Sequence, residues 1–164
     1  RLVAGDPNGD LPSELEKSDQ ASLHFLQAAQ FTGQMRFLVR ADGATDGWAQ
    51  KVLSHGWSIQ HRLGPPNDYE AGARYWLFMR VRATAEDKKL SGYALRAGFH
   101  AAGGGTRGGL PMAQADGQWH TVNLGQFQGP TDGGGFFICL DAQTKGAISD
   151  AQIDCMWISA KGSE

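Results

Sequence analysis

Several strand-length runs in this sequence alternate apolar with polar side chains. The clearest run covers residues 75–82, and residues 57–63 and 119–125 follow the same pattern. Successive side chains of a β-strand point to opposite faces, so this alternation is typical of a strand with one buried face. No long helical stripe competes with these runs. We therefore expect an all-β domain.

Turn-forming segments rich in Gly, Asp and Pro separate the runs. The 164 residues include 23 glycines, which suits a fold with many tight turns because glycine adopts positive φ at little cost. We interpret residues 1–20 as a linker or N-terminal extension with at most one short helical turn, and residues 21–164 as one domain. The glycine-rich stretch 101–109 is expected to be a surface loop. Strands are predicted near 21–31, 34–41, 47–54, 57–63, 73–83, 93–100, 119–124, 135–141 and 151–160.

About nine short strands without intervening helices indicate a β-sandwich or a barrel. The formal net charge of −2 argues against bulk attraction to nucleic acid or to an anionic membrane. No run approaches the roughly 20 apolar residues that cross a bilayer. Cys139 and Cys155 each lie within a strand-like run. We interpret them as two buried free thiols, and a disulfide between them is the alternative, which would fit a secreted protein.

Sequence motifs for catalysis are missing from the chain. The histidines have no metal-ligand spacing, no serine lies in a G-x-S-x-G turn, and the glycine-rich stretch lacks the ending of a phosphate loop. We therefore favour a non-catalytic domain. A small polysaccharide lyase remains an alternative, and it would need His100 or His120 to converge with Arg and Tyr side chains in a groove.

Alternation also predicts which side chains face outward. In run 75–82, Tyr75 and every second residue after it form an apolar face, which leaves Trp76, Phe78, Arg80 and Arg82 outside. If residues 57–63 and 93–100 belong to the same sheet, one polar and cationic outer face results. Such a face suits an acidic glycan, because arginine pairs bidentately with carboxylate or sulfate. The alternative is an ordinary solvated face. The expected face consists of Gln60, Arg62, Trp76, Arg80, Arg82, Arg96 and His100.

The loop rim at one end of the sandwich is a second candidate surface. We place Trp48, His55, Tyr69 and Arg107 there. Trp119 lies on the opposite face from Val122 and Leu124, so it is either an exposed platform or a packing residue. Trp57 and Trp157 are assigned to the core.

The order of five segments resembles that of a known family. They read QAAQF at 27–31, DGATDG at 42–47, YWLFMRVR at 75–82, DGQWHTV at 116–122 and IDCMWI at 153–158. Together they resemble the galactose-binding-like jelly roll of non-catalytic carbohydrate-binding modules appended to polysaccharide-degrading enzymes. The resemblance covers residues 21–160. It implies a two-sheet antiparallel β-sandwich, a secreted setting, and a polysaccharide or oligosaccharide and the catalytic domain of a parent protein as partners.

The resemblance also raises the question of a structural calcium ion. Members of this family often carry acidic side chains in the first strand that help to bind one, whereas this chain has Gln27 and Gln30 there. Asp42, Asp46 and Asp154 could still supply oxygen ligands, and the alternative is that they make Asx-turns. The sequence thus predicts a carbohydrate-binding module of a plant, algal or microbial polysaccharide. Its main rival is a structural spacer that packs on a catalytic domain without binding sugar.

Overall fold

A computed structural model describes residues 23–32, 37–56 and 58–160. The expected linker at residues 1–20 and Trp57 lie outside the described residues. Ten strands and three short 3₁₀ helices follow one another in the described part, which contains no α-helix. The all-β prediction is therefore confirmed. The strands are β1 (Leu23–Gln27), β2 (Leu38–Arg40), β3 (Trp48–Lys51), β4 (Ile59–Leu63), β5 (Arg74–Ala85), β6 (Tyr93–His100), β7 (Thr106–Pro111), β8 (His120–Gln128), β9 (Gly134–Leu140) and β10 (Ile148–Ala160).

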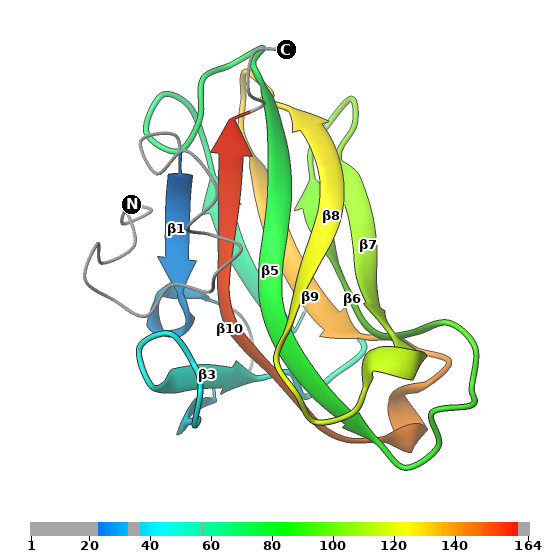
Figure 1. Cartoon of the computed structure of the whole chain (residues 1–164). Helices are drawn as coiled ribbons and strands as arrows, with labels where there is room; N and C mark the ends of the chain where they lie inside the picture. Colours follow the sequence, from blue (N-terminus) through cyan, green and yellow to red (C-terminus); the bar gives the residue numbers. More distant parts are fainter. Residues whose placement is uncertain (1–22, 33–36, 57, 161–164) are drawn as a thin grey trace.

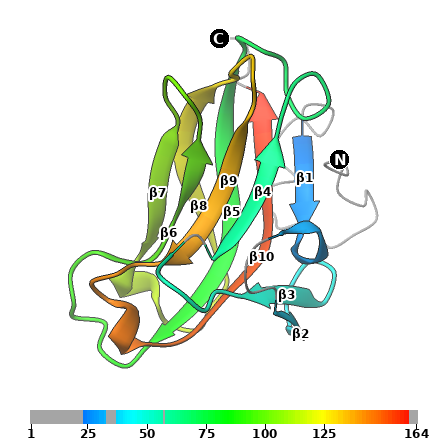
Figure 2. The same cartoon turned by 180° about the vertical axis from the view of Figure 1, so that it is seen from behind.

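Two antiparallel sheets pack face to face (Figures 1 and 2). The larger sheet has six strands in the order β2-β3-β10-β5-β8, and β1 also pairs with β10. The smaller sheet has four strands in the order β4-β9-β6-β7. Figure 1 views the molecule from the larger sheet, and Figure 2 views it from the smaller one. The architecture is the two-sheet sandwich that the sequence predicts.

The core lies between the two sheets and follows the alternation of β5. Leu77, Met79 and Val81 are fully buried, as predicted from the pattern. At one end of the core an aromatic cluster fills the space, with the rings of Phe99 and Phe127 4.6 Å apart between centroids and Tyr69 edge-on to both. Each such side chain removes roughly 150–250 Å² from water, so the cluster is a large part of the hydrophobic stabilisation.

The prediction that residues 101–109 form only a loop is wrong, because β7 begins at Thr106. The reason is the close approach of two backbones. A Cβ on Gly98 of β6 would lie 2.1 Å from the Thr106 carbonyl oxygen, and a Cβ on Gly109 would lie 2.1 Å from the Leu95 carbonyl oxygen. Glycine at these positions is what allows β6 and β7 to pair, so a glycine-rich segment forms a strand.

The single cationic face predicted from three strands is also wrong. Strand β5 belongs to the larger sheet, whereas β4 and β6 belong to the smaller one. Gln60, Arg62, Arg96 and His100 therefore lie on one side of the sandwich, and Trp76, Arg80 and Arg82 lie on the other. Alternation within residues 57–63 and 93–100 also predicts that Ser58 faces outward and Tyr93 inward, and both predictions are wrong. Ser58 is buried at 2% exposure, and Tyr93 is 36% exposed because the register shifts between Tyr93 and Leu95.

Trp157 is buried, as expected, but outside the main core. Its ring stacks on Phe78 with centroids 5.3 Å apart, and Phe78 lies on the outer side of β5. Cys139 and Cys155 are both buried free cysteines, one in each sheet, which confirms the interpretation as two thiols. No helix among the described residues is long and apolar enough to cross a membrane.

Candidate functional site

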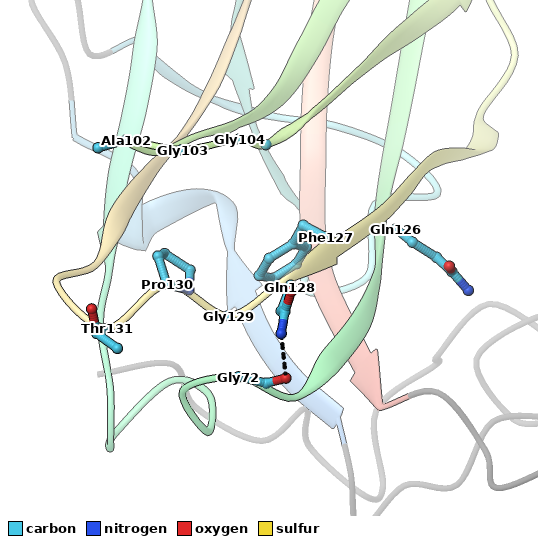
Figure 3. A pocket seen from close by; sticks show the side chains of 11 residues that line it. Gly72, Ala102, Gly103, Gly104, Gln126, Phe127, Gln128, Gly129, Pro130 and Thr131 are labelled. Carbon is cyan, nitrogen blue, oxygen red and sulfur yellow. Dashed lines mark hydrogen bonds between the residues drawn. The ribbon is translucent and has the colours of Figure 1, made fainter.

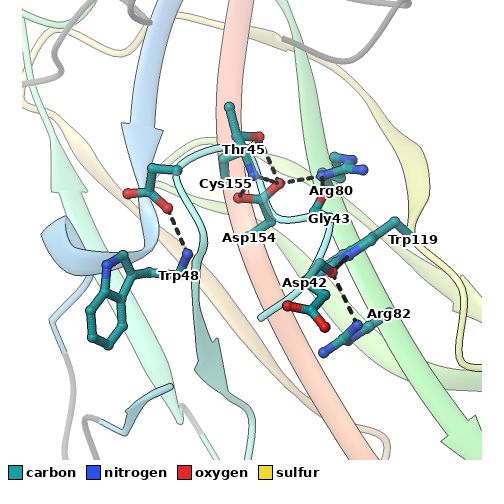
Figure 4. Close-up of polar contacts among 10 residues, drawn as sticks. Asp42, Gly43, Thr45, Trp48, Arg80, Arg82, Trp119, Asp154 and Cys155 are labelled. Carbon is teal, nitrogen blue, oxygen red and sulfur yellow. Dashed lines mark hydrogen bonds and ion pairs between the residues drawn. The ribbon is translucent and has the colours of Figure 1, made fainter. Parts of the chain in front are cut away.

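The turn between β2 and β3 lies on the outer face of the larger sheet (Figure 4). The backbone N–H of Thr45 donates to both carboxylate oxygens of Asp154 at 3.0 Å, and the Thr45 hydroxyl donates to one of them at 2.7 Å. The guanidinium of Arg80 donates to the same carboxylate at 2.6 Å and to the carbonyl of Gly43 at 2.7 Å. These contacts join the turn to β5 and β10.

Arg82 and Trp119 complete the attachment of this turn. The indole N–H of Trp119 donates to the carbonyl of Asp42 at 3.0 Å. The guanidinium carbons of Arg80 and Arg82 lie 5.1 and 4.7 Å from the Trp119 ring centroid. Trp119 is thus a packing residue here, which was one of its two predicted roles. Arg80 and Arg82 were expected on a ligand-binding face, but their guanidinium groups donate hydrogen bonds to other residues of this protein.

Asp154 is the carboxylate most altered by its surroundings. Its side chain has no solvent exposure, and this burial raises its pKa above the ordinary range, although the hydrogen bonds from Thr45 and Arg80 act in the opposite direction. A buried carboxylate of this kind needs a cationic partner, and Arg80 is that partner.

Two of the three aspartates considered as calcium ligands, Asp46 and Asp154, have other roles. Asp46 accepts a hydrogen bond from the backbone N–H of Trp48 at 3.0 Å, which is an Asx-turn, and the side chain of Asp42 is exposed. Among the described residues, no three His, Cys, Asp or Glu side chains come together as a metal site. At Asp154, one carboxylate oxygen is already engaged by the Arg80 guanidinium and the Thr45 hydroxyl.

The residues expected on the loop rim are not gathered into one surface. Tyr69 is 1% exposed, and its hydroxyl donates to the carbonyl of Pro130 at 2.8 Å, so it belongs to the core and not to the rim. Trp48 is half-buried beneath Arg40, whose guanidinium carbon lies 4.3 Å from the ring centroid. His55 is exposed and lies 3.1 Å from the Lys145 amine. Trp76 is half-buried on the outer side of β5.

The outer side of the smaller sheet brings several predicted residues together. We call it the small-sheet face. One cross-strand row runs from Gln60 on β4 through Phe137 and Gly98 to Arg107 on β7. The next row runs from Arg62 through Gly135 to His100. In the row on the other side, Cys139 lies opposite Arg96 and Arg96 opposite Gly109. The small-sheet face consists of Gln60, Arg62, Tyr93, Arg96, His100, Arg107, Phe137 and Cys139.

Two hollows lie on this face. One has a volume of about 260 Å³ and is bordered by Tyr93, Arg96, Arg107 and Phe137. The other has a volume of about 330 Å³ and is bordered by Gln60, Arg62, His100 and Asp132. Phe137 and Gln60 are cross-strand neighbours, so the two hollows adjoin. The two hollows together combine polar and charged side chains with the aromatic side chains of Tyr93 and Phe137, a combination typical of ligand sites.

One arginine of the small-sheet face, Arg96, has a carboxylate partner. Arg96 forms an ion pair with Asp141 and lies over the Tyr93 ring at 5.5 Å from its centroid. Burial of Asp141 tends to raise its pKa, but the hydrogen bond from Arg96 and that from the Gln143 backbone outweigh burial and lower it. The carboxyl of Asp141 therefore stays charged, and Arg96 is held in place as a platform above Tyr93.

The lyase alternative finds little support in this geometry. His100 and Arg62 border the same hollow, but no tyrosine does. His120 lies 2.8 Å from Asp116, and this hydrogen bond lowers the pKa of the Asp116 carboxyl. Asp116 lies in the β7–β8 connection and His120 begins β8, and neither residue borders a hollow of the small-sheet face.

A third hollow lies at the end of the sandwich, between the 101–105 loop and the β8–β9 connection (Figure 3). Its volume is about 470 Å³, and its lining is neutral, with Gln126, Gln128, Thr131 and glycine backbone around Phe127. The Gln128 amide donates to the carbonyl of Gly72 at 3.0 Å. This hollow shares Ala102 with the hollow beside His100, so it continues the small-sheet face around the loop.

Sequence reasoning missed Tyr93 as an exposed residue and Phe137 as a residue on the outer side of β9, where Phe137 is largely covered at 8% exposure. The signal for Phe137 was present, since consecutive residues of a strand point to opposite faces, and here Phe136 belongs to the main core whereas Phe137 does not. For Tyr93 no comparable signal exists, because its exposure depends on a register shift at the start of β6.

Comparisons with known proteins show what fold this is. No protein-family model matches the sequence, and no curated protein matches it either. Solved structures do match. A family 35 carbohydrate-binding module from Clostridium thermocellum aligns with a TM-score of 0.58 at 14% identity, over 83% of this chain and 98% of the module. The CBM22-1 xylan-binding domain of Xyn10C from Paenibacillus barcinonensis aligns with a TM-score of 0.58 at 9% identity, over 85% and 91%.

The Podospora anserina GH26-CBM35 β-(1,4)-mannanase aligns with a TM-score of 0.59 at 14% identity, over 87% of this chain. The match covers 28% of that mannanase, so this chain corresponds in size to one part of it. The fold of this protein is therefore the β-sandwich of carbohydrate-binding modules, as its resemblance to the galactose-binding-like jelly roll implies.

Proposed function

We propose that this domain is a non-catalytic carbohydrate-binding module that holds a polysaccharide on its small-sheet face. The observation that carries the proposal is the pair of adjoining hollows on that face, with Tyr93 and Phe137 beside the polar side chains of Gln60, Arg62, Arg96, His100 and Arg107. Aromatic rings pack on the apolar side of a sugar, and the polar groups hydrogen-bond its hydroxyls.

The fold supports this proposal, since the similar structures include carbohydrate-binding modules and a xylan-binding domain. The outer face of the larger sheet is a weaker candidate for sugar binding. The turn at residues 41–47 forms hydrogen bonds with Arg80, Arg82 and Trp119 there. We further infer that the domain works outside the cell and is joined to a catalytic domain, as in the GH26-CBM35 mannanase. Joining would raise the effective concentration of the enzyme at its polymer.

Affinity electrophoresis of the whole chain against a panel of neutral and acidic polysaccharides tests the proposal. The informative variant is Tyr93→Ala, which removes an aromatic side chain that is 36% exposed on the face. Leu90→Ala is the matched control, since Leu90 is an exposed apolar residue, at 42%, that borders neither hollow of the face. We expect a polysaccharide to retard the parent chain and Leu90→Ala, and to retard Tyr93→Ala much less.

Two other outcomes would contradict the proposal in different ways. Retardation that is insensitive to Tyr93→Ala but lost in Thr131→Val would move the site to the neutral hollow beside the 101–105 loop. No retardation by any polymer would leave the structural spacer as the better interpretation.

A further inference from the structure

The arginines in the described part of the chain differ in whether another side chain engages their guanidinium group. Arg80 and Arg96 form ion pairs with aspartates, Arg82 donates to the Gln152 side chain at 3.0 Å, and Arg40 lies over Trp48. Arg62 and Arg107 on the small-sheet face differ from these four, as does Arg74 on β5 of the larger sheet. Within the part of the chain that the structure describes, none of these three has a carboxylate within 4.0 Å or any other recorded side-chain partner. Arg62 and Arg107 are exposed, so both guanidinium groups are available to a ligand.

These two arginines lie on opposite edges of the small-sheet face. Arg62 is on β4 and Arg107 is on β7, which are the outer strands of the sheet. Neighbouring strands lie about 4.8 Å apart, so the three steps from β4 to β7 separate the two backbones by about 14 Å. On the two strands between them, Phe137 and Gly98 lie in the row of Arg107, and Gly135 and His100 lie in the row of Arg62. A chain laid across the sheet would meet one guanidinium at each side.

The remaining charges of the face decide its sign. Asp141 is engaged by Arg96, and this pair cancels. Asp132 borders the hollow beside Arg62 and His100, and it forms no ion pair within 4.0 Å among the described residues. Arg62 and Arg107 thus outnumber one exposed carboxylate. A net positive face on a chain of net charge −2 is a local concentration of cations.

We propose that the small-sheet face selects anionic polysaccharides, with Arg62 and Arg107 each binding a carboxylate or sulfate group of one polymer chain while Tyr93 contacts a sugar ring. This inference rests on the glycan-binding function proposed above and names its substrate class. A guanidinium presents paired N–H donors that match the geometry of carboxylate and sulfate. Two such contacts at opposite edges of the sheet would also fix the direction in which the chain crosses it.

The test measures the dissociation constants of the whole chain for two matched pairs of polymers. Polygalacturonate is compared with its fully methyl-esterified form, and dextran sulfate is compared with dextran. The variants are Arg62→Gln and Arg107→Gln. The control is Arg74→Gln, which removes the same charge at an exposed position on β5 of the larger sheet. Thermal unfolding of all four proteins should coincide, because these arginines are exposed.

We expect the charged member of at least one pair to bind and its neutral counterpart to bind far more weakly. Arg62→Gln and Arg107→Gln should each weaken binding by roughly five- to tenfold, and Arg74→Gln should not. Raising the salt concentration should weaken binding further. Binding of polygalacturonate alone assigns the anion to a uronate, and binding of dextran sulfate alone assigns it to a sulfate ester.

Three results would overturn the inference. Equal binding of a neutral polymer, unaffected by either variant, would leave the glycan-binding function standing and remove the charge selectivity. Equal losses in Arg62→Gln and Arg74→Gln would mean that the polymer responds only to overall charge. Failure to bind any polysaccharide, charged or neutral, would remove the proposed function and the inference with it.

Discussion

The carboxylate of Asp154 lies 2.6 Å from the Nη1 atom of Arg80, in a site where Asp154 has no solvent exposure. This ion pair links β5 to β10 and, through Thr45 and Gly43, holds the β2–β3 turn against the larger sheet. Residues that sequence patterns suggest for ligand binding thus serve to fasten a loop.

Removing Arg80 should destabilise the protein strongly. The Arg80→Met variant leaves Asp154 buried without its cation, and breaking a buried pair in this way costs about 3–5 kcal/mol. Urea unfolding at pH 7 measures the loss. In the same variant the pKa of Asp154 should rise further, so part of the loss should be recovered as the pH falls and the carboxyl takes up a proton.

The double variant Arg80→Met with Asp154→Leu provides the control for this pair. It removes both charges, so it should be more stable than Arg80→Met alone. If Arg80→Met unfolds at the same urea concentration as the parent chain, the ion pair contributes nothing to holding the turn.

Gly98 should be intolerant of any side chain. A Cβ there would lie 2.1 Å from the Thr106 carbonyl oxygen, which is backbone and cannot move without breaking the β6–β7 pairing. We expect Gly98→Ala to lower the free energy of unfolding by about 1–3 kcal/mol or more. Gly146→Ala is the control, because no atom lies within 4 Å of a Cβ at that position, and it should change stability by about 0.5 kcal/mol at most. Equal effects of the two substitutions would contradict the close packing of β7.

Tyr69→Phe should reduce stability without affecting ligand binding. The hydroxyl of Tyr69 donates to the Pro130 carbonyl at 2.8 Å inside the aromatic cluster, so its loss should cost about 1 kcal/mol. Thermal unfolding gives the stability, and affinity electrophoresis on a bound polysaccharide gives the binding. If Tyr69→Phe keeps the melting temperature of the parent chain but is no longer retarded by the polysaccharide, Tyr69 is a ligand-binding residue and the prediction is wrong.

His61 should make the protein less stable in acid. Burial lowers its pKa below 6.5, although Asp68 nearby acts in the opposite direction, and its Nδ1 atom is buried with no hydrogen-bond partner among the described residues. In the window just below pH 6.5 the unfolded chain binds the proton and the folded chain does not, so stability falls as the pH falls through that window. Unfolding measured at pH 7.5 and at pH 5.5 should show a smaller loss for His61→Gln than for the parent chain. An equal loss would mean that His61 is protonated as readily in the folded state as in the unfolded one.

The two cysteines should be unreactive in the folded protein. Burial raises the pKa of both thiols, that of Cys155 well above its usual value, so little thiolate forms near neutral pH. A thiol reagent at pH 7.5 should label neither residue in buffer and both in guanidinium chloride without a reductant. Labelling that requires a reductant would indicate a disulfide instead of two thiols.

The sequence predicts the strands better than it predicts their partners. Alternation is a local property, and in β5 it correctly separates Leu77, Met79 and Val81 from their outward neighbours. Sheet membership depends on pairing between distant segments, such as β5 with β10 and β6 with β9. Nothing in the residues of β5 alone shows that Arg80 lies on the opposite side of the sandwich from Arg96.

The sequence predicts only part of the candidate site, because alternation shows which residues face outward but not which strands share a sheet. Gln60, Arg62, Arg96 and His100 are outward residues of their own strands, and the structure places them together on one sheet. Arg107 lies beside them on β7, a strand that was not predicted because its sequence is rich in glycine. Glycine is usually a sign of a turn, and only the distance between two backbones shows that here it permits a strand.

The alternation within the smaller sheet has a practical consequence for protein engineering. Gln60, Arg62 and Arg107 project from one side of strands whose other side carries Ile59, Leu63 and Leu110 in the core. A library randomised at the three outward positions would therefore leave the packing between the sheets untouched. New binding preferences could be selected on this scaffold without compensating mutations, provided that Gly98 and Gly109 are kept fixed.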